Sequence, residues 1–435
     1  MNLLIPYGRA ADQYLSLAAQ ELGHRVYLLC NFSDSERLGE VGRTCLPDFW
    51  IPIATRYDLK MTPDDYLNWY HEQLRECVSR NKIDAILPCS SMDLIINQVA
   101  QVNEEFDLSG IRPNQAEFYR DKSTYLPAMI NHGVRVPEIY EIVEPQAEPK
   151  NYDLPFPVIA KPGLGSGGYG IYIAENENLM RWFFGPSDNP GAFSDRAMFY
   201  QDRDFSGLPK TYLHYGFGGK YIIQEHIPGP CISLAGTTVN GIPKVDLVYD
   251  IGISPPPTCA EVDFGWPSIH REAEVAAREL VSSLEGIDPP LPDGAWMADA
   301  ILNDGKLWLV DFAPRMSSSG TKMMYHTTKD LSYAKNVINA SMGKSDQIIK
   351  PNPTCSTFYS FIPFAKGKIM NVRYPNHEFQ EAVLPVRNGS RVYEMRNDLQ
   401  VADRGWVVAS SETDSRESVQ DTVQEFINNI SYDTE

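Results

Sequence analysis

The chain has 435 residues, more than one ordinary hydrophobic core accommodates, so two to four domains are expected. Its 57 acidic and 38 basic side chains give a formal charge of -19, which argues against nucleic acid or an anionic membrane as a partner. The seven cysteines show no CxxC spacing, which favours reduced thiols in a cytoplasmic protein over disulfides or a zinc site. The N-terminal apolar run is short, ends at a proline and has no basic segment, so a first β-strand is expected there rather than a signal peptide. No apolar run reaches the ~18 residues of a membrane span.

The first 115 residues alternate strand-like and helix-like segments, which is the pattern of an α/β domain. Short apolar runs predict strands at 2–7, 24–31 and 83–90. Amphipathic patterns predict helices over 10–23 and 62–81. The run at 83–90 is apolar almost throughout, as in a strand covered on both faces. A small open parallel sheet is therefore expected.

The regular alternation of strand-like and helix-like segments ends near residue 118. A helix that carries Lys122 is expected to stop at Gly133, and the proline-rich, acidic stretch 144–157 is typical of a connection. Residues 185–220 show no period at all. So long an aperiodic segment in a compact domain is usually functional or disordered, and we expect a lid or substrate loop there.

The stretch 158–174, VIAKPGLGSGGYGIYIA, places five glycines between two apolar runs. Gly163, Gly165 and Gly168 satisfy GxGxxG, but the dinucleotide fingerprint needs a helix directly after the loop, and IYIA predicts a strand instead. The Walker motif is excluded because no GK[ST] closes the loop. The remaining alternatives are a flexible hairpin over a phosphate chain and a plain surface hairpin.

Glycines suit the first alternative because backbone N–H groups must approach phosphate oxygens with no Cβ in the way. Ser166 can add a hydroxyl donor, and Lys161 can supply a positive charge at the end of the incoming strand. A strand, a glycine loop and a returning strand is the arrangement that lays such a flap over a nucleotide.

The second half of the chain predicts antiparallel hairpins. Strand-like runs at 231–253 and 296–312 contain the turn sequences Asn240-Gly241 and Asp304-Gly305. A helix is expected over 268–286, and the tail from about 350 predicts a small α+β element with a final helix.

Two aspartates in the 296–312 hairpin are candidate metal ligands. Antiparallel pairing can bring Asp299 and Asp311 to one face, and Mg²⁺ binds through one or two carboxylates together with phosphate oxygens. Arg315, four residues beyond Asp311, can place a bidentate donor on a transferring phosphoryl group. Alone these residues would more often form a surface ion network. Together with the glycine loop they favour a nucleotide site.

In these motifs the chain resembles the ATP-grasp superfamily, in its carboxylate-amine ligase branch. The resemblance lies in the order of RDKSTYL, GVRVPE, IAKPGLGSGGYGI, IIQEHIPGP and LVDFAPR. It implies a mixed α/β and α+β fold with an N-terminal open parallel domain, two α+β subdomains that grip ATP, and a small C-terminal α+β element. The implied boundaries are 1–115, 116–226, 227–350 and 351–435.

The resemblance also implies residue roles. Lys122 and Lys161 would contact the α- and β-phosphates, Asp299 and Asp311 would hold Mg²⁺, and Arg315 would be the catalytic residue that steadies the γ-phosphate or acyl phosphate. The glycine flap would cover the phosphate tail, and a hinge segment would line the adenine. The implied ATP-binding residues are Lys122, Lys161, Gly163, Gly165, Ser166, Gly167, Gly168, Gln224, Glu225, His226 and Ile227.

The implied chemistry joins a small-molecule carboxylate, an amino acid for example, to an amine at the expense of ATP, through an acyl phosphate. Such phosphoryl transfer needs positioning and charge neutralisation rather than a protein nucleophile. The resemblance also implies a homodimer. Two alternatives stay open: a phosphotransferase acting on a hydroxyl or enol oxygen, and a nucleotide-binding regulator without turnover.

Two positions depart from the family pattern. Ala313 stands where an asparagine commonly ligates a second Mg²⁺, which leaves one or two ions open; Ser317, Ser318, Ser319 or water could fill the vacancy. Cys231 stands where a glutamate commonly binds the ribose, so Glu225 is a candidate for that role.

Overall fold

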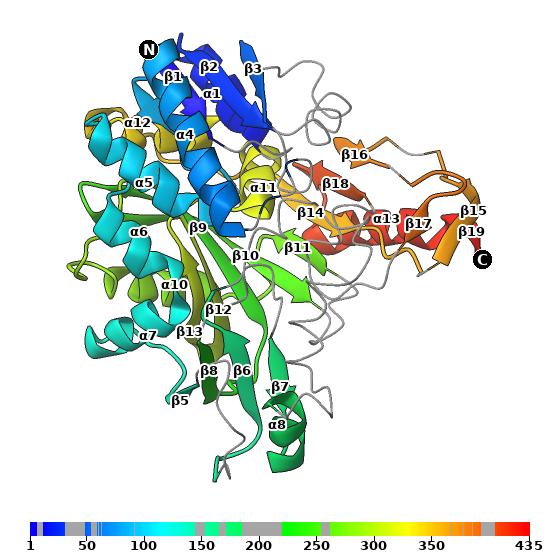
Figure 1. The fold of residues 1–435 in the computed structure, drawn as a ribbon. Helices are drawn as coiled ribbons and strands as arrows, with labels where there is room; N and C mark the ends of the chain where they lie inside the picture. The colour runs from blue at the N-terminus through cyan, green and yellow to red at the C-terminus, as the bar shows by residue number, and fades with distance from the viewer. Residues whose placement is uncertain are drawn as a thin grey trace.

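A computed structural model gives the fold (Figure 1). The residues that it describes are 1–6, 12–30, 48–53, 59, 61, 63–90, 92–143, 153–164, 171–184, 220–253, 262–365, 367–376, 378–384, 386–392 and 405–435.

The N-terminal region is a parallel sheet with strand order β3-β2-β1-β4, as the alternation of strand-like and helix-like segments predicts. Its strands are β1 (Asn2–Ile5), β2 (Arg25–Cys30), β3 (Phe49–Pro52) and β4 (Ala85–Ile86). Its helices are α1 (Gln13–Glu21), α4 (Pro63–Asn81) and α5 (Ile96–Glu105), with the 3₁₀ turn η2 (Met92–Leu94) after β4. Pro63 opens α4, where its missing N–H costs nothing.

Two short helices lead from this region into a second sheet. They are α6 (Pro113–Arg120) and α7 (Lys122–Asn131), and Asp121 between them caps α7 by accepting a hydrogen bond from Ser123 N. The second sheet is antiparallel, with order β5-β8-β6-β7. It contains β5 (Ile139–Val143), β6 (Val158–Pro162), β7 (Tyr172–Ala174) and β8 (Tyr221–Glu225), with α8 (Glu177–Phe184) beside it.

The pairing of β6 with β7 confirms the strand on each side of the glycine loop. The segment after the loop is therefore a returning strand, and no helix opens there. In Figure 1 this sheet and α8 form the lower end of the molecule.

An eight-stranded antiparallel sheet forms the middle of the molecule, with order β13-β12-β9-β10-β11-β14-β18-β16. Its first five strands by chain order are β9 (Cys231–Val239), β10 (Ile242–Ile253), β11 (Val262–Trp266), β12 (Gly294–Asn303) and β13 (Lys306–Ala313). Helix α10 (Ala273–Ser282) packs against β10 and β13. Helices α11 (Ser318–Thr328) and α12 (Ser332–Ser341) and the 3₁₀ turn η4 (Ser345–Gln347) follow.

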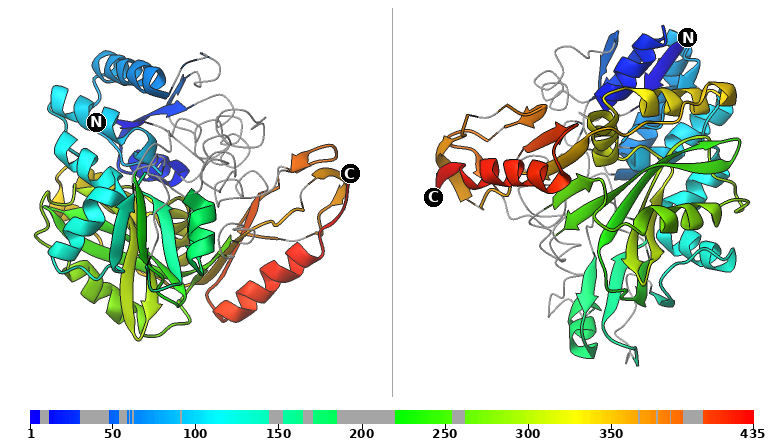
Figure 2. Two further views of the ribbon diagram at one scale, coloured as in Figure 1. Left: turned by 60° about the horizontal axis from the view of Figure 1, so that its bottom comes forward. Right: turned by 180° about the vertical axis from the view of Figure 1, so that it is seen from behind.

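The C-terminal region shares this sheet, because β14 (Ser356–Phe361), β18 (Trp406–Ser411) and β16 (Glu381–Val383) extend it beyond β11. A separate three-stranded sheet has the order β17-β15-β19, with β15 (Gly367–Arg373), β17 (Arg391–Val392) and β19 (Ser431–Thr434). Helix α13 (Arg416–Asn428) packs on β14 and β18. Figures 1 and 2 show this small sheet and α13 projecting to one side of the body.

The apolar cores join the parts of the chain. One cluster runs from the β1–β2–β4 strands to α11 and α12, and includes Leu4, Ile86, Met323 and Val337. A second lies between α7, α10 and the β12–β13 hairpin. Buried apolar surface of this kind is the main stabilising term in folding, so the N-terminal sheet is held firmly to the large sheet. Across the described part of the chain, no helix is both long and apolar enough to span a membrane.

Candidate functional site

A pocket lies where the N-terminal region, the small antiparallel sheet and the β12–β13 hairpin meet. Its charged lining comes from η2, α6, α7, β13 and the residues just after β13. The residues that line it are Asp93, Tyr119, Arg120, Lys122, Leu164, Met297, Asp311, Phe312, Ala313 and Arg315. Three predicted site residues, Lys122, Asp311 and Arg315, therefore share one pocket.

The β12–β13 hairpin places the two predicted metal ligands opposite each other. Its turn uses Asp304 and Gly305, both at positive φ (49° and 68°), as the sequence predicts. Asp299 pairs with Asp311 across the two strands. On the other side, Asp299 pairs with Ser233 of β9, whose hydroxyl donates to Asp299 Oδ1 at 2.8 Å.

A bulge follows this pair. The register steps from Asp299–Asp311 to Ala300–Leu309, so Val310 has no partner residue in β12. The Val310 carbonyl oxygen instead accepts a hydrogen bond from Lys161 Nζ at 2.7 Å. Bulges beside functional sites commonly re-aim side chains in this way.

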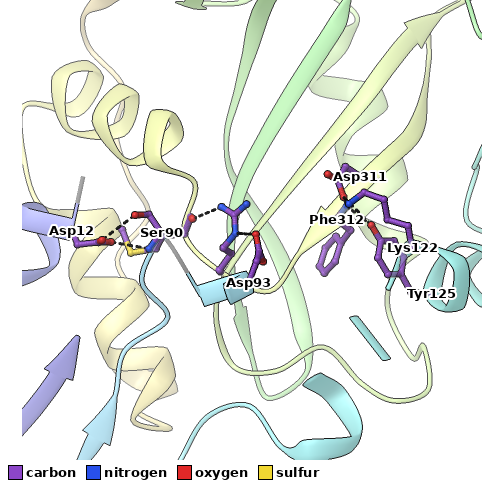
Figure 3. A network of polar contacts seen from close by, with 9 residues as sticks. Asp12, Ser90, Asp93, Lys122, Tyr125, Asp311 and Phe312 are labelled. Atoms are coloured by element: carbon purple, nitrogen blue, oxygen red, sulfur yellow. Dashed lines mark hydrogen bonds and ion pairs between the residues drawn. The ribbon is translucent and has the colours of Figure 1, made fainter. Parts of the chain in front are cut away.

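Asp311 is the centre of a polar network that links α7 to β13 (Figure 3). Lys122 Nζ lies 3.1 Å from Asp311 Oδ1, and the hydroxyl of Tyr125 donates to the same oxygen at 2.9 Å. The backbone N–H of Phe312 donates to Asp311 Oδ1 at 2.9 Å and to the Tyr125 hydroxyl at 3.0 Å. Burial and the neighbouring Asp311 carboxylate raise the pKa of Tyr125 well above its ordinary value, so the phenol stays a donor.

Lys161 lies near the end of β6 and is only 4% exposed. Burial lowers the pKa of Lys161 to about 7, Asp311 opposes the shift, and Lys122 reinforces it. A bound anion would stabilise the protonated form of this amine and offset the repulsion from Lys122, so the two lysines suit an anion-binding site.

Gly163, at the start of the glycine loop, contacts two other segments of the chain through its backbone. Its carbonyl accepts from Lys122 N at 2.9 Å, and its N–H donates to the Lys220 carbonyl at 2.7 Å. A Cβ at this position would lie 2.3 Å from Asp121 Oδ1. Glycine is therefore required for close packing between α7, β6 and the start of β8. The predicted flap residues Gly165, Ser166, Gly167 and Gly168 lie outside the described residues, as does the predicted lid over 185–220 except for Lys220.

Arg315 is held by a residue of the N-terminal region. Its Nε donates to Asp93 Oδ2, and its Nη1 donates to the Met316 carbonyl at 2.9 Å. The Arg315 and Asp93 side chains are 11% and 25% exposed. Nearby, Ser90 donates to Asp12 through both its backbone N–H (2.8 Å) and its hydroxyl (2.9 Å), which ties β4 to α1 (Figure 3).

The predicted adenine-binding segment lies at the end of β8. Gln224 is 1% exposed, and within the described structure its Oε1 is buried without a hydrogen-bond partner. Ile227 is also buried, whereas His226 is partly exposed. The Glu225 carboxylate accepts from Glu138 N at 3.4 Å, so it is engaged in closing β8 onto the chain before β5.

Cys231, in the position expected for a ribose ligand, is partly exposed. Burial and the carboxylates of Asp299 and Asp311 raise the pKa of its thiol well above the ordinary value. This thiol is therefore a poor nucleophile and a poor substitute for a glutamate.

No group of three or more His, Cys, Asp or Glu side chains in the described residues forms a ready-made metal site. Ala313 offers no ligand atom. Ser317, one of the predicted substitutes, accepts from Gly320 N at 3.0 Å as the N-cap of α11 and lies 3.2 Å from the Ser319 hydroxyl. The two aspartates therefore fit an ion that takes its other ligands from phosphate and water.

Three site residues were missed by the sequence reasoning: Asp93, Arg120 and Tyr125. Tyr125 lies one helical turn after Lys122, so its position on the same face could have been predicted. Asp93 follows the carboxyl end of β4, where open parallel sheets commonly bind ligands. Arg120 has no comparable signal.

Comparison with known proteins supports the fold. Neither a family model nor a curated protein sequence matches the chain. Among solved structures, the L-amino acid ligase from Bacillus licheniformis is 14% identical, with a TM-score of 0.72 over 100% of this chain and 98% of that chain. The phosphoribosylglycinamide synthetase from Anaerococcus prevotii is 16% identical, with a TM-score of 0.61 over 100% and 99%.

A third structure is the biotin carboxylase domain of the Hydrogenobacter thermophilus 2-oxoglutarate carboxylase, in complex with MgADP, ADP and bicarbonate. It is 16% identical, with a TM-score of 0.65 over 100% of this chain and 90% of that chain. These similarities confirm the ATP-grasp fold that the motifs predict.

Proposed function

We propose that the chain is an ATP-dependent carboxylate-amine ligase that forms an amide or peptide-like bond through an acyl phosphate. The observation that carries the proposal is the meeting of Lys122, Lys161 and Asp311, from three separate segments, beside Arg315. An ammonium, a carboxylate and a guanidinium line one pocket, and the titrating amine of Lys161 is hydrogen-bonded to the β13 backbone next to Asp311. Together these groups can hold a magnesium-bound triphosphate. The L-amino acid ligase and the phosphoribosylglycinamide synthetase among the structural neighbours support the same function.

The residues present fit ATP. The buried Gln224 Oε1 lacks a partner in the described structure, and an adenine amino group would supply the missing donor. Ile227 offers an apolar surface to the ring. Lys122 and Lys161 would contact the phosphates, and the flap from Gly163 to Gly168 would cover them.

The residues also fit one Mg²⁺. The described hydrogen bonds to Asp311 all end on Oδ1, which leaves Oδ2 for a metal, and Asp299 stands opposite. A bound Mg²⁺ would neutralise phosphate charge and orient the phosphoryl group. With Ala313 beside them, these two carboxylates are the protein ligands that we assign.

The reaction needs no protein nucleophile. A substrate carboxylate oxygen attacks the γ-phosphorus of ATP, the bond to the bridging oxygen of ADP breaks, and an acyl phosphate forms. The amine then attacks the acyl carbon, inorganic phosphate leaves with the bonding electrons, and the amine loses a proton. Arg315 would stabilise the charge on the transferring group through its planar donor fork.

An amino acid is the substrate class that we favour. Arg315 and Asp93 line the pocket together, one as a cation and the other as an anion. A free amino acid presents the complementary pair, a carboxylate and an ammonium group. The zwitterion would then bind at the Arg315–Asp93 ion pair, with its carboxylate at the other guanidinium N–H groups and its ammonium group at Asp93.

The remaining assignments stay proposals. The cytoplasmic location is supported by the free thiols among the described cysteines, Cys77, Cys89, Cys231 and Cys355. The domain boundaries and the homodimer stay predictions.

One assay tests the proposal. Purified protein is incubated with ATP, Mg²⁺ and pairs from a panel of amino acids, organic acids and amines, while phosphate release and product masses are followed. We expect phosphate release together with a product whose mass equals both substrates minus water. A stable phosphorylated product would favour the phosphotransferase, and ATP binding without turnover across the panel would favour the regulator. Asp311→Asn serves as the inactive control.

A further inference from the structure

Tyr125 contacts the proposed metal ligand in a way that the ATP-binding roles above do not explain. Its ring lies on α7, one turn after Lys122, and both side chains reach Asp311 Oδ1. Residues three apart lie on one helix face, so α7 presents an ammonium and a phenol to the same carboxylate oxygen.

The Tyr125 hydroxyl makes two directed hydrogen bonds. It donates to Asp311 Oδ1 at 2.9 Å and accepts from Phe312 N at 3.0 Å. The Tyr125 side chain is 1% exposed, so its ring is fixed by packing. The hydroxyl therefore holds both the side chain of Asp311 and the backbone that follows it.

These bonds orient the carboxylate. Three donors converge on Oδ1: Lys122 Nζ, the Tyr125 hydroxyl and Phe312 N. None of the described residues donates to Oδ2, and Asp311 lines the pocket. A carboxylate fixed through one oxygen can present the other to a metal with little loss of freedom on binding.

We infer that Tyr125 is a positioning residue that orients Asp311 for Mg²⁺ binding (Figure 3). This inference rests on the proposed function, because it needs Asp311 to be a metal ligand. In this role the phenol would act only through Asp311 and the backbone that follows it. The role differs from that of Lys122, whose charge also acts on the phosphates.

Tyr125→Phe tests the inference, because it removes the hydroxyl and keeps the ring. ATP binding is measured by calorimetry in EDTA and then across a Mg²⁺ titration. We expect the half-saturating Mg²⁺ concentration to rise at least about tenfold, as for other partners of metal ligands, with ATP affinity in EDTA unchanged. Saturating Mg²⁺ should restore ATP affinity to the wild-type value.

Tyr374→Phe is the matched control. It also removes one hydrogen-bonded tyrosine hydroxyl, here one that donates to the Val386 carbonyl at 3.0 Å in the C-terminal region. It should leave the Mg²⁺ dependence unchanged. An unchanged Mg²⁺ dependence in Tyr125→Phe would overturn the inference. If the ATP affinity of the wild-type protein did not change with Mg²⁺ concentration, the metal site of the proposed function would be overturned instead.

A second measurement keeps the inference testable if Tyr125→Phe fails to fold. Incorporation of 3-fluorotyrosine at position 125 retains the hydroxyl and nearly the same shape. Its ¹⁹F resonance should move when Mg²⁺ is added to the ATP complex, because the metal withdraws charge from Asp311. A resonance that does not respond to Mg²⁺ would refute the positioning role.

Discussion

The charge state of Lys161 should control ATP affinity near neutral pH. The residue is 4% exposed, and burial lowers the pKa of its amine from 10.5 to about 7. At about 1.4 kcal/mol per pH unit, this difference corresponds to about 5 kcal/mol that disfavours the buried ammonium. The triphosphate would place negative charge beside Lys161 and offset that cost, so ATP binding should raise its pKa.

The sign of the pH dependence follows from this linkage. In the free protein at pH 8 about one Lys161 in ten is protonated, whereas in the complex nearly all are, so binding takes up about 0.9 proton. At pH 6 the amine is already protonated, and uptake falls to about 0.1 proton. ATP affinity should therefore weaken about fivefold between pH 7 and pH 8.

Titration calorimetry at pH 8 in buffers of different ionisation enthalpy counts the protons directly. Lys161→Met has a similar volume without the amine, and its binding should be weaker and take up no proton at this residue. Equal proton uptake by wild type and Lys161→Met would refute the reasoning. So would a wild-type affinity that does not change between pH 7 and pH 8.

Three further substitutions probe the site and its support. Asp311→Asn should lower Mg²⁺-dependent turnover roughly 100-fold or more with a melting temperature near wild type, because an amide is a weaker ligand for a hard cation; full activity would reject the metal assignment. Arg315→Lys keeps the charge but loses the fork, and kcat should fall ~10²- to 10³-fold with ATP affinity unchanged; an unaltered kcat would remove Arg315 from the reaction. Arg416→Met leaves the buried Asp250 carboxylate unpaired, which should cost ~3–5 kcal/mol in urea unfolding, and an undiminished stability would contradict that contribution.

Local signals in the sequence predict much of the fold. Asn240-Gly241 and Asp304-Gly305 take positive φ at both residues, so the two hairpins follow from their turns. The turn alone would set Asp299 opposite Val310, so the opposition of Asp299 and Asp311 depends on the bulge at Val310. The returning strand after the glycine loop excludes a dinucleotide fingerprint, as the alternating residues indicate.

Contacts between distant segments could not be predicted in this way. Asp93 and Arg315 are 222 residues apart, and Lys161 reaches the Val310 carbonyl across 149 residues. The bulge that exposes this carbonyl has no marker in the run LWLVDF. The C-terminal strands that extend the large sheet pair through long-range backbone hydrogen bonds, which periodicity does not encode.

Because Ala313 offers no ligand atom, it bears on how many Mg²⁺ ions bind and on how much phosphate charge the lysines must neutralise. With Asp299 and Asp311 as its protein ligands, the proposed site holds one Mg²⁺ in place of two. The phosphate charge that a second ion would neutralise then falls to Lys122 and to Lys161. Because Lys161 is half neutral near pH 7, the protein can supply this charge only by taking up a proton as ATP binds. The pKa of Lys161 in the ATP complex should therefore rise further when Mg²⁺ is scarce, since the amine then faces more of the uncompensated phosphate charge.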